Sequence, residues 1–105
     1  MGRATVGRDG YAIAMTDRDQ WTRRLLQHGV PAHLHDGLIA YVDDHRPPGD
    51  TLLAILRNDL RQTMAHADPV TVDALPAIVS FLTWDTPADC WGSPDIVRGW
   101  LCWAR

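Results

Sequence analysis

Residues 47–69 read PPGDTLLAILRNDLRQTMAHADP, and the apolar side chains between the two proline turns recur at the spacing of an α-helix. Pro47-Pro48-Gly49 is a turn signal, and Asp50 is a favoured N-cap residue. The apolar stripe that follows, the strongest in the chain, consists of Leu52, Leu53, Leu56, Leu60 and Met64, with Ile55 beside it. The pattern predicts one helix over 51–66.

Upstream of this segment, two more helical patterns carry clear boundary signals. Acidic residues suit the first turn of a helix over 17–28, and Gly29 fits the C′ position at its end. A second amphipathic pattern predicts a helix over 31–44, with Pro31 in its first turn.

Downstream, two helices are predicted to begin with an N-cap residue followed by proline. Asp68-Pro69 opens an apolar pattern over 69–84, within which Pro76 is expected to bend the helix. Ser93-Pro94 repeats the signal before a helix over 94–103.

These patterns predict an all-α fold. No strand pair or hairpin pattern is present. We expect a compact bundle of four to five short helices, formed by a single domain over 16–105 and preceded by a loose N-terminal arm over 1–15.

The composition excludes several chemistries. All ten basic residues are Arg and all thirteen acidic residues are Asp, so lysine Schiff-base chemistry and a P-loop are excluded. No Gly-x-Ser-x-Gly motif is present, and we expect no enzymatic activity and no cofactor. No apolar run approaches the roughly 20 residues of a membrane span, and residues 1–8 lack the apolar region of a signal peptide. A cytoplasmic protein is therefore expected.

The cysteines and histidines form no metal pattern. His33 and His35 point about 200° apart on a helix, so we expect solvated histidines and no metal site. Cys90 and Cys102 are expected about 13–18 Å apart, too far for a disulfide, and are predicted to be free thiols.

Charge is placed unevenly along the chain. The net charge is −3, and residues 62–97 hold five Asp and no Arg. Such a segment disfavours phosphate contact and suits a basic partner surface. The alternative is that these Asp residues mostly cap helices.

Arginine and tryptophan supply the other candidate contacts. Arg57 and Arg61 share a face of the predicted 51–66 helix, where they contact either a partner anion or a neighbouring Asp. Four of the five Trp residues lie within 84–103. Three of them suit the core, whereas Trp103 lies at the end of an apolar helix that predicts extra coverage or a partner.

Five short motifs resemble a recurrent group of short phage and prophage proteins, over about residues 30–103. They are Pro47-Pro48-Gly49, Asn58-Asp59-Leu60, Ala67-Asp68, Leu75-Pro76-Ala77-Ile78-Val79 and Cys90-Trp91-Gly92-Ser93-Pro94. The chain departs from the group at Thr83-Trp84-Asp85-Thr86-Pro87, where the group usually has Tyr-Asn before an acidic loop. The resemblance implies a mobile-element origin. Inhibitors of CRISPR effector complexes are one class of small phage protein that acts by binding. By analogy with them, inhibition of such a complex is a hypothesis for this chain.

Two functional hypotheses follow. The first is a non-enzymatic protein that binds and inhibits a host protein complex, in the manner of an anti-CRISPR protein. Its predicted partner-binding residues are Asp68, Asp73, Asp85, Asp89, Trp91, Arg57, Arg61 and Trp103. The second is a small nucleic-acid-binding regulator that dimerises through its last helix. Its phosphate contacts would be Arg23, Arg24, Arg57 and Arg61.

Overall fold

The computed structural model describes residues 17–102, and its regular structure is helical. The six α-helices are α1 (Asp17–His28), α2 (His35–Asp44), α3 (Asp50–Leu56), α4 (Leu60–His66), α5 (Pro69–Asp85) and α6 (Pro94–Leu101). Short 3-10 turns, η2 (Ala32–Leu34) and η3 (Ala88–Cys90), precede α2 and α6. The all-α prediction is confirmed, but the described part alone has more helices than the predicted four to five. The arm predicted over 1–15 lies outside the described residues.

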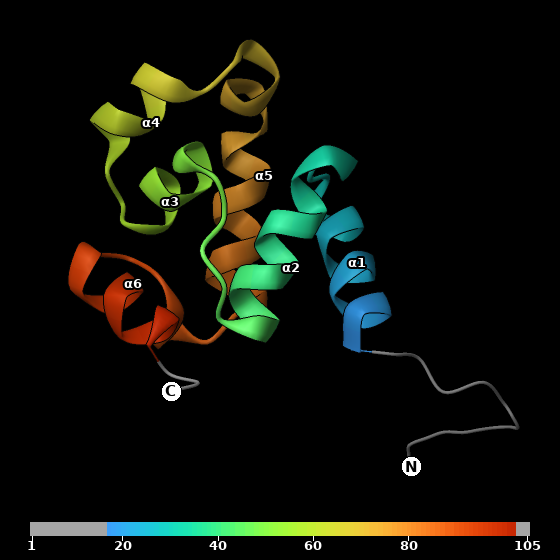
Figure 1. Cartoon of the computed structure of the whole chain (residues 1–105). Helices are drawn as coiled ribbons and strands as arrows, with labels where there is room; N and C mark the ends of the chain where they lie inside the picture. The colour runs from blue at the N-terminus through green and yellow to red at the C-terminus, as the bar shows by residue number, and fades with distance from the viewer. Residues whose placement is uncertain (1–16, 103–105) are drawn as a thin grey trace, which may run out of the picture.

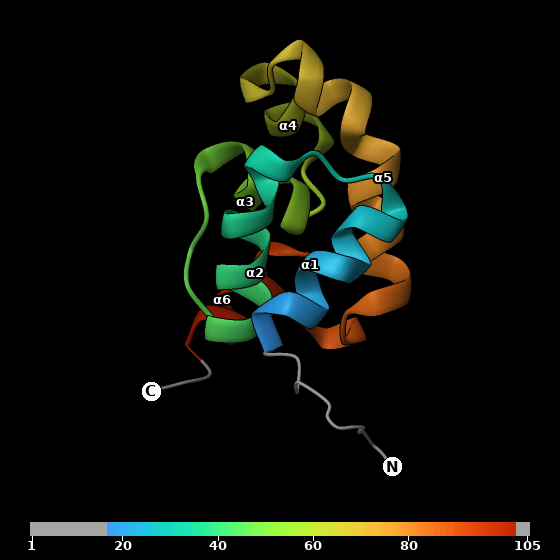
Figure 2. The same cartoon turned by 90° about the vertical axis from the view of Figure 1, so that its right-hand side faces the viewer.

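The longest helix, α5, runs through the middle of the bundle (Figure 1). Helix α1 packs against both α2 and α5, and α4 packs against α3. Figures 1 and 2 both show α4 at the end of the molecule where α5 begins. The most deeply buried apolar side chains come from four of these helices and from α6: Leu25, Leu38, Leu56, Ile78, Phe81, Leu82 and Val97. Within residues 17–102 no helix combines the length and apolarity that crossing a bilayer requires.

The single helix predicted over 51–66 is two helices. Asn58 follows α3 with φ 60°, in the left-handed region. Its N–H donates to the Ile55 carbonyl, and the Asp59 N–H donates to the Ala54 carbonyl, which is the hydrogen-bond pattern of a Schellman motif. Asp59 then caps α4, with its Oδ1 accepting from the Gln62 N–H at 3.1 Å. Although the leucine spacing continues past this point, Asn58 tolerates the left-handed backbone that ends α3, and Asp59 is a favoured N-cap residue that begins α4.

Helix α5 continues through Pro76 as one helix of 17 residues. Its beginning is as predicted, because Asp68 accepts a hydrogen bond from the Thr71 N–H at 2.8 Å. This bond lowers the pKa of the Asp68 carboxyl, since it favours the charged form. Pro76 has no N–H to donate to the Val72 carbonyl, and its ring lies on an exposed face of the helix.

Tyr41, on α2, ties the C-terminal part of the chain to the core. Its side chain is fully buried, and its hydroxyl donates to the Cys90 carbonyl at 2.6 Å. The Tyr41 carbonyl accepts from Trp100 Nε1 at 2.8 Å. Burial raises the pKa of Tyr41 above its usual value, which keeps the hydroxyl protonated as a donor. One residue of α2 therefore holds both ends of the segment from η3 to α6.

The end of α2 adds a further link to α6. His45 adopts a left-handed backbone with φ 58°, and its Nδ1 lies 2.8 Å from the Trp100 carbonyl. Because a carbonyl can only accept, Nδ1 carries the hydrogen in this contact. The His45 and Trp100 rings also lie close, with centroids 4.2 Å apart. Helix α6 is thus fixed to α2 by two hydrogen bonds, each from a side chain of one segment to a backbone carbonyl of the other, and by the contact of the two rings.

Several side chains differ from their predicted environment. Trp84 is 77% exposed rather than part of the core, while Trp91 and Trp100 pack against the core as expected. His33 is exposed as predicted, but His35 is buried and its Nε2 lies 2.8 Å from the Val30 carbonyl. Helical spacing indicates which side chains share a face of a helix, but it does not indicate which face another helix covers.

We expect Asn58→Ala to lower the free energy of unfolding by about 1 kcal/mol, because alanine pays the steric cost of a left-handed backbone. Asn58→Gly should change it by less than about 0.5 kcal/mol, since glycine adopts this conformation freely. Urea unfolding followed by circular dichroism measures both. Equal stability of the two variants would contradict the left-handed turn.

We also expect the two free thiols to differ in reactivity. Cys90 is buried and Cys102 is exposed, and burial raises the pKa of the Cys90 thiol. Ellman's reagent at pH 8 should therefore react with one thiol quickly and with the other only slowly. Cys102→Ser should remove the fast phase, and a fast phase that persists in this variant would contradict the assignment.

Candidate functional site

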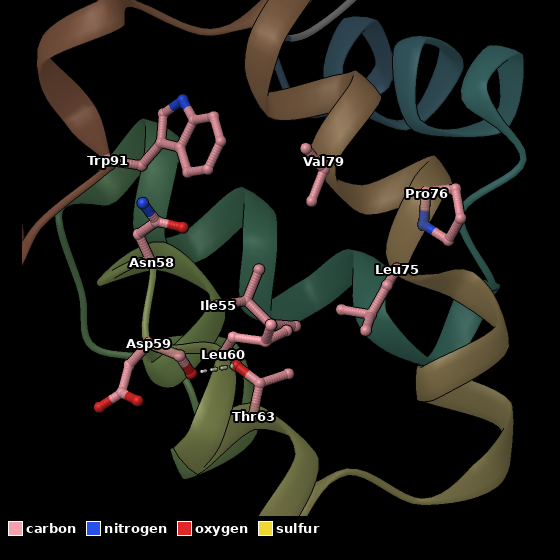
Figure 3. A pocket seen from close by; sticks show the side chains of 9 residues that line it. All are labelled: Ile55, Asn58, Asp59, Leu60, Thr63, Leu75, Pro76, Val79 and Trp91. Carbon is pink, nitrogen blue, oxygen red and sulfur yellow. Dashed lines mark hydrogen bonds between the residues drawn. The ribbon is translucent and has the colours of Figure 1, made fainter.

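An open groove of about 360 Å³ lies between α3, α4, α5 and the segment after η3 (Figure 3). Apolar side chains from all four walls dominate its surface. The nine lining residues are Ile55, Asn58, Asp59, Leu60, Thr63, Leu75, Pro76, Val79 and Trp91.

The break between α3 and α4 opens this groove. Leu60, which a continuous helix would have carried along the stripe of α3, begins α4 and is 68% exposed. Figure 3 shows Leu60 facing the cavity opposite Leu75 and Val79 of α5. Met64, one turn further along α4, is also exposed. The α3–α4 turn therefore converts part of the predicted core stripe into surface.

The face of α5 that lines the groove is also apolar. Leu75 and Val79 are four residues apart and point to the same side of the helix, with Pro76 beside them. Val79 is 39% exposed, and Pro76 lies in an exposed position. The α5 wall of the groove is therefore formed by apolar, uncharged side chains.

Trp91 closes one end of the groove, and hydrogen bonds on both sides of it fix its position. The Gly92 N–H donates to the Leu56 carbonyl at 2.7 Å, which joins the segment to the end of α3. On the other side, the Cys90 carbonyl accepts from the buried Tyr41 hydroxyl. Among the predicted partner-binding residues that the structure describes, Trp91 is the one that lines the groove.

Two of the polar lining residues, Asp59 and Thr63, take part in hydrogen bonds within α4 and its N-cap. Thr63 Oγ1 donates to the Asp59 carbonyl at 2.8 Å, and Asp59 Oδ1 accepts from the Gln62 N–H. Among the lining residues within 17–102, Asp59 alone is charged, and Figure 3 shows its carboxylate at the rim, pointing away from the cavity. The groove combines an apolar interior with a carboxylate at its edge.

The predicted acidic residues do not form one cluster. Asp68 caps the start of α5, and Asp73 is exposed one turn later. Asp85 lies at the other end of this helix, about 25 Å away at 1.5 Å per residue, and its carboxylate contacts His28 Nε2. Asp89 is exposed in η3. An acidic contact surface over all four would have to follow the whole length of α5.

The predicted basic residues lie on separate elements. Arg57 ends α3 and Arg61 lies on α4, so the two do not share a helix as the sequence predicted. Arg23 and Arg24 belong to α1, on the far side of α2 and α5 in Figure 1, and the Arg24 guanidinium lies 5.2 Å from the Trp21 ring. The four arginines of the nucleic-acid hypothesis therefore come from opposite sides of the bundle. Trp103 lies outside the described residues.

A second polar cluster, which the sequence analysis did not single out, joins α1 to α5. His28 Nδ1 lies 3.0 Å from Ser80 Oγ, and His28 Nε2 contacts the Asp85 carboxylate. Serine, histidine and carboxylate follow one another as in a hydrolase triad. Ser80, however, lies in the middle of α5, where the neighbouring N–H groups are used within the helix and leave no oxyanion donors. We interpret the cluster as a clamp between α1 and α5.

The residues between 17 and 102 contain no grouping of three or more His, Cys or Asp side chains suited to a metal ion. His33 and His35 contribute to different environments, one exposed and one buried.

We expect Ser80→Ala to lower the free energy of unfolding by about 1 kcal/mol, through loss of one hydrogen bond to His28. The rate of p-nitrophenyl acetate hydrolysis measured in the presence of the protein should be the same for the wild type and for this variant. Thermal unfolding and an absorbance assay provide the two measurements. Loss of hydrolysis in Ser80→Ala with unchanged stability would make the cluster catalytic instead of structural.

Comparison of the chain with protein-family models, with curated proteins and with solved structures finds no match. The resemblance to short phage and prophage proteins accordingly stays a prediction from the motifs. Function is argued from the groove and from the chemistry of its residues.

Proposed function

We propose that this chain is a non-enzymatic binding protein that docks on a host protein complex and inhibits it. The observation that carries the proposal is the apolar groove between α3, α4 and α5. Contiguous exposed apolar surface is characteristic of sites that bind other macromolecules. Here the apolar lining includes the exposed side chains of Leu60 on one wall and Val79 on the other.

The groove contains side chains that contribute strongly to binding when they are covered. Full burial of an exposed aliphatic side chain stabilises by about 1.5–3 kcal/mol, and covering Leu60 (68% exposed) and Val79 (39% exposed) would contribute the corresponding part of this. Trp91 is half-buried and held in place, and tryptophan is enriched among the residues that dominate interface energies. Because the Trp91 wall is already held in place, it loses little conformational entropy on binding. More of the free energy gained by burying its side chain therefore contributes to affinity.

The proposed class of partner comes from the resemblance to phage proteins together with the charge of the chain. A net charge of −3 disfavours nucleic acid and favours a protein with a basic surface. A CRISPR effector complex is such a partner, because its subunits bind nucleic acid. By covering a surface of that complex, the protein would inhibit it through binding alone, without catalysing a reaction.

The test is a nuclease-treated pull-down from bacterial lysate that contains a CRISPR effector complex, combined with an assay of plasmid interference. We expect an effector subunit to be retained in stoichiometric amount and interference to fall when the protein is expressed. An unrelated acidic helical protein serves as the control. Retention of no effector subunit above that control, or retention without loss of interference, would contradict the proposal.

A further inference from the structure

We draw no further inference here: the strongest candidate, the apolar groove between α3, α4 and α5, carries nothing beyond the proposed function, because nothing in the structure shows what covers it.

Discussion

The buried hydrogen bond from the Tyr41 hydroxyl to the Cys90 carbonyl is the contact on which the C-terminal third of the molecule depends. It joins residues 49 positions apart in the sequence, between α2 and the end of η3. The Tyr41 carbonyl then accepts from Trp100 Nε1, so the same residue also positions α6. The buried Tyr41 hydroxyl would be unsatisfied without the Cys90 carbonyl, and that cost makes the arrangement specific, whereas the Tyr41 carbonyl also accepts from the His45 N–H.

The groove is a consequence of this anchoring together with the turn between α3 and α4. Tyr41 fixes Cys90, and the Gly92 N–H binds the Leu56 carbonyl, so Trp91 is held between two fixed points. The left-handed turn at Asn58 directs α4 away from the line of α3 and leaves Leu60 opposite Val79. Apolar surface that would otherwise continue the core becomes the lining of the groove, and hydrogen bonds to the backbone of the Trp91 segment hold one end of it in place.

Local signals in the sequence predicted the boundaries of most helices, because caps and turns depend on neighbouring residues. Gly29, Asp68 and Ser93 take the positions expected of them. Asn58 was missed because asparagine is a weaker C′ signal than glycine and the leucine spacing continues past it. The groove could not be predicted: Leu60 and Trp84 are apolar residues on helical patterns, and only the tertiary packing determines that both are exposed. The contact of His28 with Ser80 and Asp85 likewise brings together residues more than 50 positions apart.

The claim that Tyr41 holds the Trp91 wall is tested most directly by amide hydrogen exchange in the wild type and in Tyr41→Phe. The account predicts that the Gly92 amide is protected in the wild type. In the variant, the Gly92 amide should exchange at least about tenfold faster than the decrease in the global free energy of unfolding would predict. The amides of α1 should exchange at the rate that this decrease predicts. Unchanged protection of Gly92, relative to α1, would contradict the account.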